Sequence, residues 1–303
     1  MKIAIASGKG GVGKSMISSS LTLLFAQKQK VTAVDCDVDA PNLHLWLGGI
    51  SKWDKVERVS VSERPVIDRQ KCNLCGKCVD ICAFGALKIN HLSPILNSYF
   101  CEGCGACEAV CPNKAIKLKP VFNAEIKTKL FNDLSLPAGL PTDRHSKANN
   151  QVIPIISAQL YPGETGSGKI VDKIKQKAEE FKYQTMILDS PAGIGCPVIA
   201  ALNGIDFVVL VTEPTPSGFS DLKRVLQVVN HFKIPFGAVI NKWDMNKKES
   251  GKIKKYFGKK VLGKISYDKK IFKAISNLTP ILKTNLKAKK EIVSIFKKLK
   301  NHV

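Results

Sequence analysis

The sequence contains no run of 18 apolar residues, and its five histidines are scattered without the spacing of metal ligands. The missing run argues against a membrane-spanning helix, and we assign the histidines no chemistry. The first residues, MKIAIASGKGG, have too short an apolar stretch and too early a glycine cluster for a secretory signal. We therefore expect a cytoplasmic protein.

Acidic residues are also scarce. The 303 residues include 25 acidic and 47 basic side chains, which gives a formal net charge of +22. Residues 242–303 alone contain 19 lysines and 4 acidic residues. A lysine-rich solvated surface is the simpler interpretation, and attraction to an acidic partner is the alternative. We expect no nucleic-acid partner, and peripheral membrane contact through this basic tail stays open.

Cysteines, in contrast, are abundant and clustered. Eight of the ten lie between Cys72 and Cys111, and in a reducing compartment such clusters are more often metal ligands than disulfides. The segment 72–89 (CNLCGKCVDICAFGALKI) matches the segment 101–118 (CEGCGACEAVCPNKAIKL) at a constant offset of 29. The sequence therefore predicts a small duplicated module.

Each copy of the repeat reads C-x₂-C-x₂-C-x₃-C, the pattern of bacterial two-cluster ferredoxins. In that pattern three cysteines hold one cluster and the fourth crosses to the other. Zinc sites use pairs of CxxC instead. Ala83 departs from the pattern, since the first copy would often have proline there. We predict two [4Fe–4S] clusters, one held by Cys72, Cys75, Cys78 and Cys111 and the other by Cys82, Cys101, Cys104 and Cys107.

The rest of the chain alternates short apolar runs with helical patterns, as an α/β protein with a parallel sheet does. Residues 121–150 lack such a pattern and predict an irregular connection with one short strand at most. We divide the chain into a nucleotide domain at 1–60, an inserted ferredoxin-like domain at 61–120, and the rest of the nucleotide domain at 121–303. Strands are expected near 2–6, 31–37, 152–158, 185–189, 206–212 and 236–241, and helices near 14–29, 168–182, 195–203, 218–232 and 291–300.

The segment 7–15, SGKGGVGKS, contains G-x-x-x-x-G-K-S between an expected strand and an expected helix. Its glycines allow backbone N–H groups to surround phosphate oxygens, and the helix adds its positive end. Lys14 should reach the β- and γ-phosphates, and the Ser15 hydroxyl should bind Mg²⁺. The predicted nucleotide-binding loop comprises Gly8, Lys9, Gly10, Gly11, Val12, Gly13, Lys14, Ser15 and Met16.

The second lysine, Lys9 in KGGVGK, resembles the deviant Walker A motif of the MinD/ParA/Mrp superfamily, the class that also includes the nitrogenase iron protein. The resemblance implies a doubly wound, mainly parallel sheet and an ATP-dependent homodimer, or a heterodimer with a paralogue, in which Lys9 reaches the partner's nucleotide. Met16 stands where the class usually has threonine, so only its backbone N–H can meet the α-phosphate.

Five further segments match this class. In VDCDVDAPN (34–42), Asp37 would orient the attacking water and take part in the Mg²⁺ site, with Asp39 in switch I. MILD (186–189) resembles Walker B, so Asp189 would hold Mg²⁺, and SPAGIG resembles switch II. VVLVTEP ends at Pro214, and NKWD begins with Asn241, which would contact the base. NKxD is better known for guanine, but the deviant loop favours ATP.

Two features have weaker interpretations. Cys196 lies seven residues after Asp189, the offset of a cluster-binding cysteine in the nitrogenase iron protein, yet no cysteine lies between Cys111 and Cys196 to serve as its second ligand. A small buried residue is the simpler expectation for Cys196 and for Cys36. Residues 163–169 (GETGSGK) look like a second P-loop but are followed by Ile170, so we interpret them as a loop near the dimer or insert interface.

The combined resemblance implies an ATPase whose nucleotide state controls electron transfer through two [4Fe–4S] clusters, with an unidentified donor and acceptor. A first alternative is an iron–sulfur carrier or assembly ATPase. A second is a MinD/ParA-like positioning ATPase that acts on membrane or DNA, with helix 291–300 as an interfacial helix. Core packing is the commoner explanation for the apolar stripe of that helix, which contains Ile292, Ile295, Phe296 and Leu299.

Overall fold

The computed structural model describes residues 1–133 and 152–303. These residues form two compact units. The larger unit contains residues 1–56, 126–159 and 167–303, and the smaller contains residues 57–125 and 160–166. The sequence-based division at 1–60, 61–120 and 121–303 did not include the short segment 160–166 in the insert.

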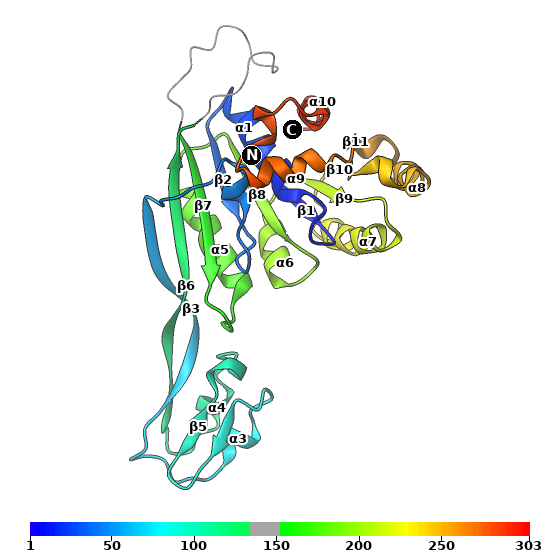
Figure 1. The fold of residues 1–303 in the computed structure, drawn as a ribbon. Helices are drawn as coiled ribbons and strands as arrows, with labels where there is room; N and C mark the ends of the chain where they lie inside the picture. Colours follow the sequence, from blue (N-terminus) through cyan, green and yellow to red (C-terminus); the bar gives the residue numbers. More distant parts are fainter. Residues whose placement is uncertain (134–151) are drawn as a thin grey trace. The chain divides into compact units, whose positions relative to one another are not determined.

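The larger unit alternates strands and helices along most of its length, as the sequence pattern predicts (Figure 1). Its elements are β1 (Lys2–Ser7), α1 (Lys14–Ala26), β2 (Val31–Asp35), α2 (Leu43–Trp46), β7 (Ile153–Leu160), α5 (Ser167–Glu179), β8 (Thr185–Ala192), α6 (Cys196–Leu202), β9 (Phe207–Thr212), α7 (Pro216–His231), β10 (Phe236–Asn241), α8 (Lys247–Phe257), β11 (Val261–Ile265), α9 (Lys269–Ser276) and α10 (Lys287–Leu299).

In the described part of the chain, nine strands form one sheet in the order β11-β10-β9-β1-β8-β2-β7-β6-β3. The seven strands from β11 to β7 pair in parallel. The carboxyl ends of parallel strands lie along one edge of a sheet, which is where α/β proteins bind ligands. The P-loop, Asp35, Asp189, Glu213 and Asn241 therefore gather at this edge.

Both faces of the central strands are buried, as near-continuous apolar runs predict for a parallel sheet. Ile3 and Ile5 of β1 point to one face, where they join the core formed with α1 and α10, and Phe25 packs edge-on against Phe296 across those helices. Helices α5, α6 and α7 cover the other face, since α5 contacts β2, α6 contacts β8, and α7 contacts β9. This arrangement confirms the α/β class with a large, mostly parallel sheet.

The smaller unit carries the cysteine repeat. Its elements are α3 (Lys77–Asp80), β4 (Leu87–Ile89), β5 (Pro94–Leu96) and α4 (Ala106–Ala109), together with parts of β3 (Lys55–Ile67) and β6 (Ile116–Phe131). Helices α3 and α4 differ by the same 29 positions as the two sequence copies. Gly76 and Gly105, with φ of 80° and 83°, precede them in the left-handed region that suits glycine. The sequence repeat is thus a structural repeat.

Two expectations need correction. Strand β6 runs without interruption to Phe131, so residues 121–131 are not an irregular connection; the rest of that predicted segment, 134–150, lies outside the described residues. The apolar stripe of α10 is at most 3% exposed and belongs to the core, so the interfacial helix of the positioning alternative is wrong in that form. Among the described residues no helix has the length and hydropathy needed to span a bilayer.

Candidate functional site

The P-loop follows β1 directly and leads into α1. Ser7 closes its start, because the Ser7 hydroxyl donates a 2.7 Å hydrogen bond to the carbonyl of Lys9. Two glycines are sterically required. A Cβ on Gly8 would lie 2.2 Å from the backbone of Asp221, and Gly13 has φ of +94° with its Cβ direction 2.4 Å from the amide nitrogen of Asn241. The loop is therefore fitted tightly between α7 and the end of β10.

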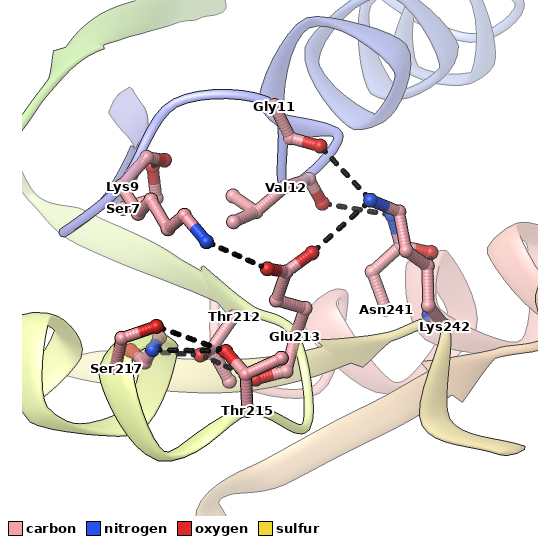
Figure 2. Close-up of polar contacts among 11 residues, drawn as sticks. Ser7, Lys9, Gly11, Val12, Thr212, Glu213, Thr215, Ser217, Asn241 and Lys242 are labelled. Carbon is pink, nitrogen blue, oxygen red and sulfur yellow. Dashed lines mark hydrogen bonds and ion pairs between the residues drawn. The ribbon is translucent and has the colours of Figure 1, made fainter. Parts of the chain in front are cut away.

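The two lysines of the loop have different surroundings. Lys14 is buried, and burial lowers its pKa even though Asp189, Asp37 and Asp35 act in the opposite direction. Lys9 is half exposed, and its ammonium lies 3.1 Å from Oε1 of Glu213 (Figure 2). Lys14 thus points to the acidic centre of the site, while Lys9 lies at its rim.

Three carboxylates meet near Lys14. Asp35 and Asp189 are register partners at the ends of β2 and β8, and both are buried. Burial raises the pKa of Asp189 to about 6, against the opposing effects of Ser15, Lys14 and Ser18. Burial and the neighbouring Asp189 likewise raise the pKa of Asp35 well above its ordinary value. A bound cation would stabilise such a cluster of buried carboxylates, so the cluster is consistent with a Mg²⁺ site at this edge of the sheet.

Asp37 occupies the more open part of the cluster, where burial raises its pKa and Lys14 partly opposes the rise. Its carboxylate accepts a hydrogen bond from the backbone N–H of Ala40 at 3.3 Å, within the predicted switch I segment. Asp35 fixes the same segment, since it accepts hydrogen bonds from the N–H groups of Asp37 and Leu43. The sequence motif gave Asp35 no role. The structure shows that its carboxylate holds the backbone of the switch I segment in place.

A pocket of about 480 Å³ lies beside the P-loop, lined by Gly13, Met16 and Asn241 together with the loop after β11 and helix α9. Asn241 is 4% exposed and donates a 2.7 Å hydrogen bond to the carbonyl of Val12, so it fixes the P-loop as well as lining the pocket. The pocket has the size and the mixed lining of a base site. Sequence analysis missed Trp46, Tyr267 and Phe272, the aromatic side chains of its wall.

The NKxD resemblance does not extend to its aspartate. Asp244 accepts a 2.7 Å hydrogen bond from the backbone N–H of Tyr267, and it does not line the pocket. The carboxylate of Asp244 is thus held by the backbone of the loop that follows β11. Pro214 is buried in the loop that leads from β9 to α7, and it too lies outside the pocket lining.

In the smaller unit, the structure brings the eight clustered cysteines into two groups. One hollow is lined by Cys72, Cys75, Cys78 and Cys111, and a second hollow is lined by Cys82, Cys101, Cys104 and Cys107. The two hollows have equal cavity volumes of about 20 Å³, as a duplicated module should have. All eight thiols are free.

Backbone contacts to the sulfurs follow the same repeat. The N–H of Ala86 donates to Sγ of Cys82 at 3.3 Å, and the N–H of Ala115 donates to Sγ of Cys111 at 3.2 Å. Burial alone would raise the pKa of Cys82, but N–H groups from residues 84–87 outweigh it and lower the pKa. At Cys82 these donors favour the thiolate, the form that binds metal.

Within the described ranges, no three His, Cys, Asp or Glu side chains are grouped closely enough to hold a single metal ion. A four-iron cluster makes a different demand, because its four thiolates bind separate irons around a larger core. Four thiols around one hollow fit that donor set.

The remaining sequence candidates fall elsewhere. Cys196 is exposed at the start of α6, so the expectation of a buried small residue was wrong there, whereas Cys36 is fully buried as expected. In the segment 163–169, which looks like a second P-loop, residues 163–166 belong to the smaller unit. In that loop Glu164 pairs with Arg64 at 2.7 Å, and the buried amide of Asn123 donates to the carbonyl of Thr165.

The fold and the phosphate-binding loop define a P-loop nucleotide-binding protein. Residues 3–281 match the CobQ/CobB/MinD/ParA nucleotide-binding domain, and the chain belongs to this family. An uncharacterised protein of Methanocaldococcus jannaschii is 35% identical over 307 residues, covering 100% of this chain and 98% of that protein.

Proteins with assigned roles are more distant. The septum site-determining protein MinD of Bacillus subtilis is 24% identical, covering 92% of this chain and 81% of that protein. Septum site-determining MinD of Pyrococcus horikoshii, solved with Mg-ADP, superposes with a TM-score of 0.58 at 15% identity, covering 98% of this chain and 95% of that one. This structural likeness shows the fold alone.

Proposed function

We propose that this protein is a MgATP-dependent switch whose nucleotide state controls electron transfer through two [4Fe–4S] clusters. The observation that carries the proposal is the division of eight cysteines between two matching hollows, each lined by three cysteines of one repeat copy and the last of the other. That crossed pattern is the one that two-cluster ferredoxins use.

The smaller unit has a reason to bind clusters beyond its donor set. Among the described residues, its buried apolar cluster consists of Cys78, Leu87 and Ile116. The side chains packed against this cluster are those of Ile67, Val79, Leu96 and the ligand candidates Cys107 and Cys111. So small a core supplies little folding free energy, and metal binding commonly supplies the rest. When bound, each cluster would supply one-electron chemistry.

In the larger unit, Ser15, Asp37 and Asp189 would hold Mg²⁺, and Asp37 would orient the attacking water. Lys14 would neutralise the β- and γ-phosphates from its buried position. The engaged carboxylate of Asp244 supports adenine over guanine as the base. Two chains would close around the nucleotide through Lys9, forming a homodimer or a pair with a paralogue.

Chain connectivity offers a route between the two functions. Strand β3 follows switch I and enters the smaller unit, and the loop 160–166 leads directly into α5. Helix α5 packs on α6, which follows switch II, and a Cβ on Gly168 would lie 3.4 Å from Cys196. A shift of either switch would thus pull on a segment that ends in the cysteine-bearing unit.

The test is anaerobic purification, followed by iron and sulfide analysis and EPR of the reduced protein with ADP or a non-hydrolysable ATP analogue. We expect about eight irons per chain, and a signal or reoxidation rate that depends on the nucleotide. The Lys14→Ala variant should keep the signal and lose the dependence. A protein without iron, or one whose signal ignores the nucleotide, contradicts the proposal.

A cluster carrier would give a different result. If the protein hands over clusters, its iron should move to an apo-acceptor on mixing, and transfer should depend on nucleotide. Retention of the iron favours permanent ligation.

A positioning ATPase is the second candidate, and the named relatives support it better than they support electron transfer. The observation in its favour is the similarity to septum site-determining MinD, together with the lysine-rich segment 242–303. Because the apolar face of α10 is buried, membrane or DNA contact through this helix would have to use its lysines. ATP-dependent co-sedimentation with anionic vesicles or DNA would support this candidate, and its absence at low salt would remove it.

A further inference from the structure

Glu213 contacts two lysines with two different oxygens. Its Oε1 lies 3.1 Å from Nζ of Lys9, and its Oε2 lies 3.1 Å from Nζ of Lys242 (Figure 2). The side chain of Glu213 is 14% exposed, against 45% for Lys9 and 29% for Lys242. The carboxylate is thus the more buried centre of a three-charge group at the rim of the P-loop.

The backbone holds Glu213 firmly. Its carbonyl accepts a 2.8 Å hydrogen bond from the N–H of Thr215, whose hydroxyl in turn accepts one from the N–H of Gly218 at the start of α7. Thr212 donates to the carbonyl of Gly218 from the end of β9. Glu213 therefore stands on a fixed turn, whereas Lys9 reaches it on a long, half-exposed side chain.

Lys242 makes the group asymmetric. Its ammonium also donates to the carbonyl of Gly11 at 3.2 Å, and its backbone has φ of 53° directly after the buried Asn241. Burial alone would raise the pKa of Glu213, but the hydrogen bonds from Lys242 and Lys9 outweigh it, so the group is ionised at neutral pH. If Lys9 moved away, Glu213 would keep its ion pair with Lys242. This largely buried carboxylate would therefore still have a cationic partner.

We propose that Glu213 is a positioning residue that retains Lys9 in the nucleotide-free chain and releases it when two chains close on nucleotide. Lys242 stays on Glu213 and makes the release reversible. The inference rests on the proposed ATP-dependent dimer for its purpose, since that dimer is where a freed Lys9 would act. Retention itself concerns the single chain and is tested there.

Retention is measured by the acetylation rate of Lys9 in nucleotide-free protein, followed by peptide mass spectrometry. Glu213→Gln removes the charge with little change of shape, so Lys9 should react about two- to fivefold faster. Lys242→Met leaves Glu213 to Lys9 alone and should slow the reaction. Asp221→Asn is the matched control, because Asp221 is on α7 and pairs only weakly with Arg224, at 3.9 Å. Equal rates in wild type and Glu213→Gln overturn the proposal.

Release is measured by sedimentation with a non-hydrolysable ATP analogue and Mg²⁺. Since two Lys9 side chains are freed per dimer, Glu213→Gln should dimerise at about three- to tenfold lower protein concentration than wild type, and Lys9→Ala should not dimerise. If wild type dimerises and Glu213→Gln does so no more readily, Glu213 does not control the release. If wild type stays monomeric while Lys9 labelling still responds to Glu213→Gln, the proposed dimer fails and the retention of Lys9 stands.

Discussion

The nucleotide site and the cysteine hollows are built in opposite ways. In the larger unit, strand ends and buried side chains bring the site together, and three of its charged groups, Lys14, Asp35 and Asp189, are buried. In the smaller unit the apolar cluster is small, and large apolar side chains such as Leu92, Tyr99 and Phe122 are more than 70% exposed. The first site is formed by the fold, whereas the second depends on what it binds.

This difference teaches where each site would fail. A parallel sheet with both faces covered keeps its edge in place when one ligand-binding side chain is lost. A small module that relies on metal for its stability loses structure together with the ligand. Loss of a ligand-binding side chain in the larger unit should therefore lower activity without unfolding the unit. Loss of a cysteine in the smaller unit should instead unfold part of that unit.

The largest effect is expected from Lys14→Ala. Lys14 is the buried cation of the P-loop, so ATP hydrolysis should fall by about a hundredfold or more. Iron content and resistance of residues 57–125 to protease should not change. The measurement is steady-state ATPase with iron analysis on the same sample, and Lys248→Ala on α8 is the control. Loss of iron in Lys14→Ala would break the comparison.

Cys104→Ser tests the opposite side. Cys104 is an exposed member of the second hollow, and its loss should reduce iron from about eight to about four per chain and speed proteolysis within residues 57–125. Nucleotide binding should remain within about twofold of wild type. Cys196→Ser is the matched cysteine outside the hollows and should leave iron unchanged. A fall in iron there would instead assign Cys196 to a cluster.

The buried acid pair makes the larger unit sensitive to pH. Burial raises the pKa of Asp189 from 3.8 to about 6, so between those values the folded chain binds more protons than the unfolded chain. The contribution of Asp189 to stability is then largest below about pH 4 and is lost as the pH rises to about 6, by on the order of 3 kcal/mol in the absence of Mg²⁺.

Denaturant unfolding of Mg²⁺-free protein across this range measures the effect. Asp189→Asn should reduce the decrease in unfolding free energy between pH 4 and pH 6. Asp39→Asn, in the switch I segment, is the control and should leave that decrease unchanged. MgADP should also flatten it, because a bound cation stabilises the ionised pair. An Asp189→Asn variant with the same pH dependence of stability as the wild type would contradict the assignment.

Local sequence carried much of this architecture. The strand β1, the loop with Gly8 and Gly13, and the repeat at an offset of 29 are each fixed by neighbouring residues, and the sequence predicted them. The long strand β6 was missed although the buried Ala124, Ile126 and Thr128 alternate in it with Glu125, Lys127 and Lys129. The expectation of an irregular connection rested on the prolines and the polar run that follow this segment. The contacts of Glu213 with Lys9 and of Asp35 with Asp189 join distant segments, so no local pattern could reveal them.

The motif NKWD is a second case in which local sequence does not reveal a tertiary contact. The motif alone does not show what Asp244 contacts, and the 2.7 Å hydrogen bond from the backbone N–H of Tyr267 gives it a structural role. Asp244→Asn should therefore change the ratio of ATP to GTP affinity by less than about threefold, while lowering the free energy of unfolding by about 1 kcal/mol.

Asn241→Ala is the informative contrast. It removes the hydrogen bond to the carbonyl of Val12, so the affinities for ATP and GTP should both fall. Titration of both nucleotides into the two variants measures the difference. A selective loss of GTP affinity in Asp244→Asn would mean that the carboxylate leaves Tyr267 to read the base, and the larger unit would then be less rigid at its ligand edge than its buried contacts imply.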